Sequence, residues 1–231
     1  MSEFSSRVVL ITGATGGLGA AVTQVFLDAG ATVAAVSRPS GRAGPADSRV
    51  LSIEADVTTT GGARSAVDAV LAKASRVDAL IHLVGGFAGG RPVSETDDAT
   101  WRQMMNLNLH SAFYMTRAVL PHMIEGRRGR IVAVGSRTGV EPAAGLAAYG
   151  VSKAGLIALV RTVAAEVKHS GITANVVLPS VIDTPANRAS NPSADPSKWV
   201  KPDAIARLLL WLASDEAADV NGAVIPIYGR A

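Results

Sequence analysis

The stretch RVVLITGATGGLG, residues 7–19, joins an apolar run to a glycine-rich segment that leads into a helix-forming sequence. Continuous apolar runs are typical of strands buried on both faces of a sheet. Gly13, Gly17 and Gly19 stand where a tight turn, a close backbone approach and helix-on-strand packing each require a missing side chain. Phosphate groups bind readily at the helix N-terminus that follows such a turn. We therefore expect this segment to bind a pyrophosphate.

The rest of the chain repeats this alternation of strand and helix. Six further apolar runs predict strands at residues 31–37, 49–55, 77–84, 129–136, 172–179 and 222–229. Helices are expected near residues 17–29, 60–74, 98–124, 147–169 and 202–213. Such alternation predicts an α/β fold, a doubly wound Rossmann domain with a parallel seven-stranded sheet.

The length and composition favour one domain. The 231 residues, 48% of them hydrophobic, suffice to bury a single large core. No linker, repeat or low-complexity tract divides the chain, so we expect residues 1–231 to form a single dinucleotide-binding domain. Residues 180–201 are rich in Pro, Ser and Asn and lack a periodic pattern. Because long irregular loops in compact domains commonly act as lids, we expect this segment to cover the substrate.

The composition also excludes several classes of function. The chain has no cysteine, which excludes disulfides, thiolate metal sites and a cysteine nucleophile. There is no signal-like start and no membrane-spanning apolar run, so we expect a soluble, cytoplasmic protein without a membrane partner. The densest basic cluster, Arg127, Arg128 and Arg130, reads as a solvated connection between helix and strand. Nucleic acid is therefore not expected as a partner.

Tyr149 and Lys153 stand four residues apart in the helix-compatible segment AAYGVSKAG, residues 147–155. Side chains four apart project from one face of a helix, so this phenol and this ammonium can serve the same pocket. A surface tyrosine beside a solvated lysine gives the same pattern. The rest of the chain has to decide between these interpretations.

Several motifs, taken in order, resemble those of the short-chain dehydrogenase/reductase family, and the resemblance runs through nearly the whole chain. Gly13, Gly17 and Gly19, preceded by Thr12, have the Gly-x-x-x-Gly-x-Gly spacing of its nucleotide-binding motif. The positions of its catalytic residues are occupied by Asn108, Ser136, Tyr149 and Lys153. The resemblance implies an enzyme that transfers hydride between a nicotinamide cofactor and a carbonyl or alcohol substrate.

The same resemblance extends to the ends of the other predicted strands. Asp56 and Val57 look like the family's adenine-contacting pair, and the segment LPSVIDT, residues 178–184, is similar to the one that holds the nicotinamide carboxamide. Tyr149 and Lys153 are expected to contact the cofactor as well. The other cofactor-binding residues expected are Thr12, Gly13, Thr15, Gly16, Gly17, Leu18, Gly19, Ser37, Arg38, Asp56, Val57, Leu83, Val84, Gly85, Pro179, Ile182 and Thr184.

Carbonyl reduction explains why a tyrosine and a lysine would be paired. The developing alkoxide needs a proton from an acid poised near neutral pH, whereas a free tyrosine has a pKa of about 10. Lys153, together with an oxidised nicotinamide, is expected to lower the pKa of Tyr149, the general acid in reduction and the base in the reverse direction. Ser136 is expected to hydrogen-bond the substrate oxygen. The resemblance further implies that Lys153 binds the nicotinamide ribose and that Asn108 holds a water chain.

The end of the second predicted strand bears on the choice of cofactor. An acidic residue there accepts hydrogen bonds from the adenosine ribose and favours NAD, whereas an arginine accommodates the phosphate of NADP. This chain has Ser37 and Arg38, with Arg42 close by and no carboxylate. NADP(H) is therefore the favoured cofactor, and NAD(H) is the alternative.

Two positions depart from the family pattern. His82-Leu83-Val84-Gly85 replaces the usual Asn-Asn-Ala-Gly after the fourth strand, and Ser180 replaces the usual glycine after Pro179. A histidine at a strand end can transfer protons but is more often a hydrogen-bonded structural residue, so His82 is left outside the catalytic set. His110, His122 and His169 show no metal-ligand grouping, so no metal site is expected.

The substrate is the least determined property. The segments 84–90 and 178–199 resemble dihydropteridine reductase, a member of the same superfamily, so pterin reduction is an alternative to reduction of another small carbonyl compound. A dinucleotide-sensing module without turnover is the alternative from another class, although such modules lose the catalytic tyrosine or lysine, and this chain retains both. Helices 98–124 and 147–169 offer surfaces for a homo-oligomer, expected as a dimer or tetramer.

Overall fold

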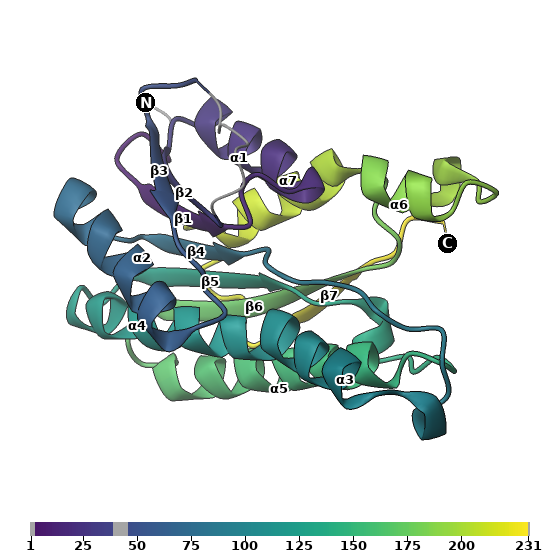
Figure 1. The fold of residues 1–231 in the computed structure, drawn as a ribbon. Coiled ribbons are helices and arrows are strands. Elements are labelled where there is room, and N and C mark those ends of the chain that lie inside the picture. The colour runs from purple at the N-terminus through teal and green to yellow at the C-terminus, as the bar shows by residue number, and fades with distance from the viewer. Residues whose placement is uncertain (1–2, 39–45, 231) are drawn as a thin grey trace.

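The computed structural model describes residues 3–38 and 46–230, so Arg42 lies outside the described residues. Seven strands form one parallel sheet with helices on both faces (Figure 1). The strands are β1 (Val8–Thr12), β2 (Thr32–Ser37), β3 (Val50–Glu54), β4 (Ala79–His82), β5 (Gly129–Val134), β6 (Ile172–Pro179) and β7 (Val224–Ile227). The predicted α/β fold and all seven predicted strands are confirmed.

The strand order is β3-β2-β1-β4-β5-β6-β7, and every neighbouring pair is parallel. The chain therefore reverses its direction of travel across the sheet between β1 and β4, where Thr12 pairs with His82. Crevices at such reversal points, beyond the carboxyl ends of the strands, are where open α/β sheets bind ligands. The topology thus places the glycine-rich segment after β1 beside the segment after β4.

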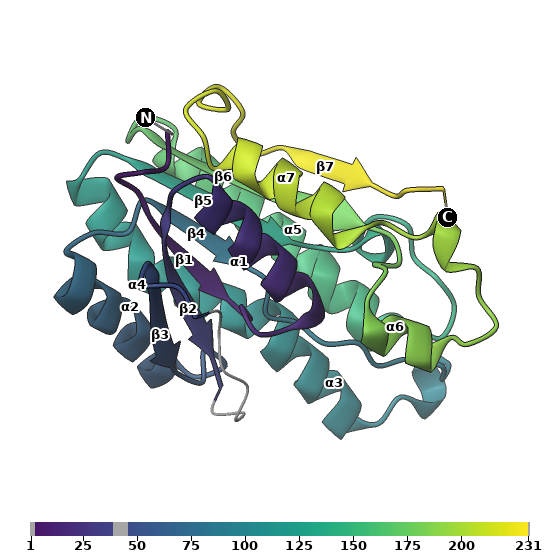
Figure 2. The ribbon, with the colours of Figure 1, turned by 90° about the horizontal axis from the view of Figure 1, so that it is seen from above.

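Two layers of helices cover the sheet. α1 (Gly17–Asp28) and α7 (Pro202–Leu212) lie side by side on one face, as the view from above shows (Figure 2). α2 (Thr60–Ala74), α4 (Ser111–Glu125) and α5 (Ala147–Val167) cover the other face (Figure 1). Along β1, Val9 and Ile11 pack in the cluster with α1 and α7, whereas Leu10 packs in the cluster on the opposite face. This double burial explains the continuous apolar runs.

The helix predicted over 98–124 is interrupted. α3 (Asp98–Met105) ends in a π-helical turn, Asn106–His110, before α4 begins. The Ser111 N–H bonds to the Asn106 carbonyl five residues earlier, which inserts one residue into the helical path. Asn108 lies within this turn and is fully buried. The predicted helical segment is therefore present, and the π-turn within it is the feature that was not predicted.

The segment 180–201 is more ordered than its composition suggests. It contains α6 (Pro185–Ser190) and a short helical turn, Pro196–Lys198. Its two ends pair like strands, since the Asp183 N–H donates to the Val200 carbonyl and the Val200 N–H donates to the Val181 carbonyl. The expectation of an irregular loop was therefore wrong in part.

The predicted solvated basic connection is also corrected in part. Arg127 and Arg128 are exposed, but Arg130 is only 6% exposed. Its guanidinium donates to the Ser214 and Gly171 carbonyls and pairs with Asp215. Arg130 therefore ties the start of β5 to the segment after α7. No helix among residues 3–38 and 46–230 is long and apolar enough to cross a bilayer.

Candidate active site

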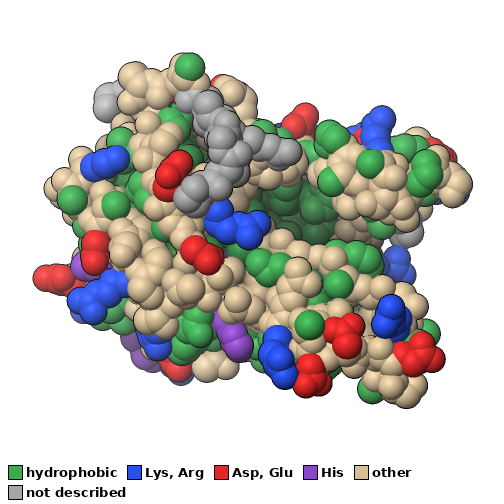
Figure 3. Space-filling view, viewed as in Figure 1, with side chains coloured by type: hydrophobic (Ala, Val, Ile, Leu, Met, Phe, Trp, Pro, Cys, Tyr) green, Lys and Arg blue, Asp and Glu red, His purple; other side chains and the backbone are tan. Residues whose placement is uncertain are grey.

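A cavity of about 310 Å³ lies along the carboxyl ends of β1 to β4. The face drawn in Figure 3 is hollowed between α6 and α3, and hydrophobic side chains line the hollow. Ten of the residues predicted to bind the cofactor line the cavity: Gly13, Thr15, Gly16, Ser37, Arg38, Asp56, Val57, Leu83, Val84 and Gly85. The cavity is also lined by four residues that were not predicted, Val36, Ala55, Thr58 and Leu107. The first three flank predicted residues, whereas Leu107 belongs to the unpredicted π-turn.

The glycine segment after β1 has the geometry of a backbone cradle. Gly13 has a φ of +73°, a conformation that favours glycine, and its N–H bonds to the Val36 carbonyl. A Cβ at Gly19 would lie 2.1 Å from the Gly13 carbonyl oxygen, so no side chain fits there. A Cβ at Gly17 would lie 3.1 Å from the Thr184 side chain, which shows that Thr184 packs beside the cradle. These residues fit a bound dinucleotide.

The far end of the cavity carries both signs of charge. Asp56 accepts hydrogen bonds from the Thr58 hydroxyl at 2.6 Å and the Thr58 N–H at 3.0 Å. These bonds, and to a lesser extent the charge of Arg38, hold the pKa of Asp56 below its usual value. Arg38 and Asp56 therefore face the same end of the cavity, where an adenosine would lie between a guanidinium and a carboxylate.

The candidate catalytic side chains converge where β5 meets α5. Ser136 follows β5, is 6% exposed, and its hydroxyl accepts a bond from the Thr138 N–H at 3.3 Å. A hydrogen bond also links Ser136 to the phenol of Tyr149 in the first turn of α5. Lys153, one turn further along α5, is 6% exposed, and its Nζ donates to the Val134 carbonyl at 2.9 Å. Tyr149 and Lys153 therefore both project from the start of α5 toward the end of β5, one to the residue that follows the strand and the other to its last carbonyl.

Burial shifts both pKa values. It lowers the pKa of Lys153 to about 8, because a buried ammonium loses its hydration. It raises the pKa of Tyr149, and the hydrogen bond with Ser136 opposes that rise. The expected lowering of the Tyr149 pKa by Lys153 and an oxidised nicotinamide stays a prediction, because these shifts are those of the protein without a cofactor. The raised pKa keeps the phenol protonated at neutral pH, which is the state that proton donation to an alkoxide requires.

Asn108 joins this cluster through the π-turn. Its Oδ1 accepts from the Gly86 N–H at 2.8 Å, and its Nδ2 donates to the Gly86 carbonyl and to the Ser152 hydroxyl. A Cβ at Gly85 would lie 2.8 Å from Asn108 Oδ1 and 3.2 Å from Lys153 Nζ. Gly85, Asn108 and Lys153 therefore meet at one point, although 68 residues separate the first from the last.

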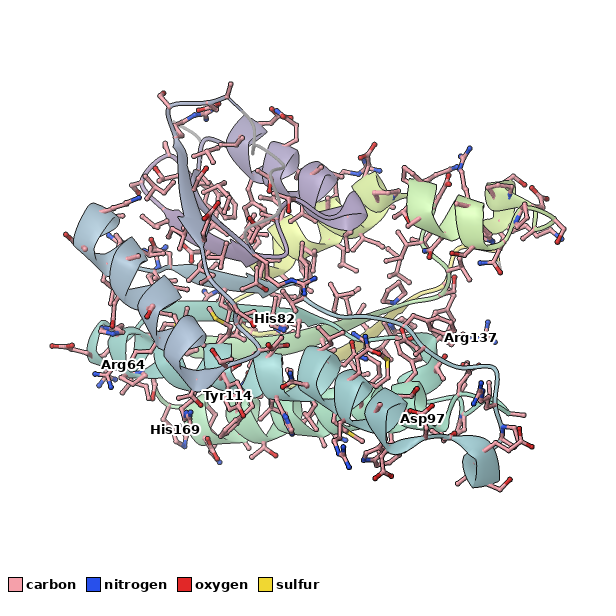
Figure 4. The ribbon with its side chains drawn as sticks, viewed as in Figure 1. Arg64, His82, Asp97, Tyr114, Arg137 and His169 are labelled. Atoms are coloured by element: carbon pink, nitrogen blue, oxygen red, sulfur yellow. The ribbon has the colours of Figure 1, made fainter. Side chains whose placement is uncertain are left out.

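Phe87 was not predicted, although it is the one large residue in the small-residue segment 84–90. Its ring packs edge-on against Tyr149 with centroids 5.0 Å apart, and it is 68% exposed. At the same end of the fold, the Arg137 guanidinium lies over the Tyr228 ring and pairs with Glu141. Arg137 and Asp97 lie toward one end of the molecule in Figure 4, whereas His82 lies in its interior.

His82 is hydrogen-bonded at both ring nitrogens, as predicted for a structural residue. Nδ1 lies 3.0 Å from the Thr12 hydroxyl and Nε2 lies 3.1 Å from the Ser111 hydroxyl. No group of three or more His, Asp or Glu side chains that could hold a metal occurs in the part of the chain that the structure describes.

Comparison with known proteins identifies the family. The sequence profile of the short chain dehydrogenases matches residues 7–195. The chain belongs to the short-chain dehydrogenase family. This short-chain dehydrogenase is 34% identical to the 3-oxoacyl-[acyl-carrier-protein] reductase FabG of Thermotoga maritima, over 98% of both chains.

Solved structures agree with this assignment. Levodione reductase superposes on this short-chain dehydrogenase with a TM-score of 0.90 at 27% identity, covering 98% of this chain and 97% of that one. The 3-ketoacyl-(acyl-carrier-protein) reductase of Brucella melitensis, solved with NADH, gives a TM-score of 0.87 at 27% identity, covering 97% and 98%. The chain is therefore an oxidoreductase that acts on CH–OH or C=O groups and binds a nicotinamide dinucleotide. The alternative of a sensing module without turnover is not supported.

Proposed function

We propose that this short-chain dehydrogenase uses NADPH to reduce the carbonyl group of a small-molecule substrate, with Tyr149 as general acid, and that Tyr149 is the base in the reverse reaction. The observation that carries the proposal is the convergence of Ser136, Tyr149, Lys153 and Asn108 beside the dinucleotide cavity. The nicotinamide supplies or accepts the hydride when it is bound. The side chains of this chain hold the substrate and move the proton.

Each catalytic side chain has a role that follows from its position. Ser136 donates a hydrogen bond to the substrate oxygen and so places it beside the Tyr149 phenol. Tyr149, protonated at neutral pH, gives its proton to the developing alkoxide. Lys153 bears a charge below a pKa of about 8, which favours the phenolate that remains. Asn108 lies beside Lys153 and holds the water chain that returns a proton.

The proposed cofactor preference rests on Arg38. It is exposed at the adenosine end of the cavity and can bind the additional phosphate of NADP. Gly13, Thr15, Gly16 and Gly17 would hold the pyrophosphate, and Leu83, Val84, Pro179, Ile182 and Thr184 would hold the nicotinamide half. NAD(H) remains the alternative, and the NADH-bound Brucella reductase makes the direct comparison of the two cofactors the deciding measurement.

The proposed lid is the segment 180–201. It follows β6 at the carboxyl edge of the sheet, and Thr184 near its start packs beside Gly17 of the cradle. A cover at this place would exclude water from the site of hydride transfer. We further propose that the protein is cytoplasmic and that it forms a homo-oligomer. The exposed apolar residues Phe113, Ile124 and Val151 on α4 and α5 support the second of these proposals.

A panel of substrates tests the reaction. Simple ketones, β-ketoacyl thioesters and quinonoid dihydropterin would each be added to the enzyme with NADPH, whose absorbance reports turnover. Tyr149→Phe is the control, since it keeps the ring and the packing against Phe87 but lacks the proton. We expect it to fold, to bind NADPH and to lose more than roughly 90% of kcat. Equal turnover by the two proteins on every substrate would contradict the proposal.

Pterin reduction is the second candidate. Phe87 favours it, because an exposed aromatic ring against Tyr149 offers a flat surface for a flat heterocycle. The Thermotoga relative is instead named as a 3-oxoacyl-[acyl-carrier-protein] reductase. The substrate panel separates the two, since kcat/KM for quinonoid dihydropterin would exceed that for the thioesters only if the second candidate is correct.

A further inference from the structure

His82 is the only buried histidine in the described part of the chain, with 2% of its surface exposed. It ends β4 opposite Thr12 of β1, at the point where the strand order reverses. In Figure 4 it lies in the interior, between the sheet and the helices of one face. The catalytic scheme proposed above does not use it.

The surrounding hydrogen bonds determine which ring nitrogen carries the proton. The Ser111 hydroxyl donates its single proton to the Leu107 carbonyl at 2.7 Å. Its oxygen can therefore only accept from His82, so Nε2 must carry a hydrogen. A neutral imidazole then has Nδ1 as an acceptor, which receives the Thr12 hydroxyl proton. That hydroxyl in turn accepts from the Leu83 N–H at 3.2 Å.

This chain of bonds has a single direction and joins two parts of the site. At one end, Thr12 immediately precedes Gly13 of the cradle. At the other end, Ser111 closes the π-turn twice, because its hydroxyl bonds to Leu107 and its N–H bonds to Asn106. Asn108 lies within that turn. The imidazole therefore spans the distance between the cofactor cradle and the turn that carries Asn108.

The charge environment keeps the ring neutral. Burial, and to a lesser extent the positive charge of Lys153 on α5, lower the pKa of His82 to about 3. The groups nearest to it on the other elements, Thr12 of β1, Ala133 of β5 and Ser111 of α4, carry no charge. A protonated ring would carry a hydrogen on Nδ1 and could no longer accept from Thr12.

We propose that His82 is a positioning residue: as the neutral Nε2–H tautomer, it fixes the π-turn and Asn108 relative to the Thr12–Gly13 cradle. It touches neither substrate nor cofactor in this role, and it acts through Thr12 and Ser111. The catalytic consequence rests on the proposed function, since it assumes that Asn108 takes part in proton return. The tautomer itself does not depend on that assumption.

The first experiment examines the apo protein and does not involve turnover. Long-range ¹H–¹⁵N spectra of the ¹⁵N-labelled wild type distinguish a protonated ring nitrogen from an unprotonated one, and His82→Leu assigns the signal. We expect His82 to show a protonated Nε2 and an unprotonated Nδ1 between roughly pH 5.5 and 8. The ring should stay neutral throughout this range, because its pKa lies far below neutrality. A protonated Nδ1 in this window would overturn the proposal.

The second experiment separates the two arms of the hydrogen-bond chain, the bond from His82 to Thr12 and the bond from His82 to Ser111. Ser111→Ala removes the partner of Nε2 and one closure of the π-turn but leaves Thr12 and the cradle intact. We expect kcat to fall roughly 10- to 100-fold, as displaced catalytic groups commonly cause, while the Kd for NADPH changes less than about twofold. His82→Leu removes both arms and should lower kcat and weaken NADPH binding together. His82→Asn, which can still donate and accept, should recover part of kcat.

His169→Gln serves as the matched control. His169 is exposed just beyond the C-terminus of α5, so this substitution should leave all parameters unchanged. A wild-type kcat in both Ser111→Ala and His82→Leu would overturn the positioning role. If no substrate of the panel is turned over by the wild type, the proposed function fails, whereas the tautomer is still tested by the spectra and the two arms by NADPH affinity. If His82→Leu does not fold, Ser111→Ala and the wild-type spectra decide.

Discussion

At the scale of single residues, burial determines the chemistry that each side chain can perform. Lys153 and Ser136 are each 6% exposed. Lys153 contacts Val134 at the carboxyl end of β5, and Ser136 contacts Thr138 in the turn that follows the strand. An ammonium in this place is stabilised by one carbonyl and is otherwise poorly solvated, which is why its pKa falls to about 8. The burial of this ammonium therefore costs folding stability, as is common at the sites where proteins carry out their function.

Replacing Lys153 by Met should therefore stabilise the protein while abolishing activity. A fall in pKa from 10.5 to about 8 corresponds to a penalty of about 3 kcal/mol. Loss of the bond to Val134 offsets about 1 kcal/mol, so we expect a gain of about 2 kcal/mol at pH 7. The lysine is charged in both states below pH 8, where the penalty is complete, and the penalty fades as pH rises toward 10.5.

Urea unfolding at pH 7 and pH 10 measures this effect. The gain should be smaller at the higher pH, and Lys168→Met, a change at an exposed position, should stay within about 0.5 kcal/mol of the wild type. A Lys153→Met protein that is less stable than the wild type at pH 7 would refute the burial argument.

Arg38 is the residue that we expect to select the cofactor. Isothermal titration should show tighter binding of NADPH than of NADH by the wild type, and the reverse order for Arg38→Asp. A charge-assisted bond to the phosphate accounts for a preference of roughly 10- to 100-fold. Arg64→Asp makes the same charge change on the exposed face of α2 and should keep the wild-type order. Equal affinities in the wild type would leave the preference without support.

At the scale of elements, the segment 180–201 is held at its base by one carboxylate. Asp183, whose side chain is 6% exposed, binds Arg188 at 2.5 and 2.9 Å and Lys201 at 2.6 Å. These two cations hold the pKa of Asp183 well below its usual value. Since Arg188 belongs to α6 and Lys201 to the end of the segment, the carboxylate joins both to the start of the segment, just after β6. Between these anchors residues 189–195 are exposed, whereas Trp199 and Val200 are buried.

Asp183→Asn should loosen this segment without altering the cradle. We expect faster amide exchange in residues 184–199 and a several-fold higher KM for substrate, with a smaller change in the Kd for NADPH. Hydrogen-exchange mass spectrometry with and without NADPH measures the first effect. Asp203→Asn, on the exposed start of α7, is the control. Exchange in 184–199 that is slow in the apo wild type and does not change with NADPH or with substrate would mean that the segment is a fixed contact and not a lid.

At the scale of the whole molecule, the burial of His82 at the end of β4 makes the stability of the fold depend on pH. In the folded state the pKa of the His82 ring is about 3, so the ring is neutral at pH 7. In the unfolded state its pKa is near 6.5. The unfolded state therefore binds more protons below pH 6.5, and stability falls as the pH drops through this window. The loss is about 1.4 kcal/mol for each pH unit once the unfolded histidine is protonated.

Chemical denaturation between pH 7 and pH 5 should show a loss of about 2 kcal/mol for the wild type. This window lies above the range in which most carboxylates titrate, so the slope reports mainly on histidine. His82→Leu should lose most of the slope, and His169→Gln should retain it. A slope that is the same in all three proteins would show that His82 is not the titrating group.

Resemblance to the family was needed to nominate Asn108 and Ser136, whereas the sequence by itself determined the sheet, the glycine cradle and the placing of Tyr149 and Lys153 on one helix. These features follow from local chemistry. Apolar runs form buried strands, Gly13 adopts a positive φ, Gly19 stands where a side chain would clash, and four-residue spacing puts Tyr149 and Lys153 on one helix face. Each of these signals is complete within a few consecutive residues. Comparison with relatives then confirmed the family.

Only the tertiary structure decided the pKa directions, the π-turn and the role inferred for His82. The partners of His82 lie 70 and 29 residues away, and which of its nitrogens is protonated depends on where the Ser111 hydroxyl points. The upward shift of the Tyr149 pKa likewise comes from the burial that the assembled chain imposes on the phenol. Solvation and hydrogen-bond direction are properties of the folded surroundings of a residue, so no local pattern specifies them.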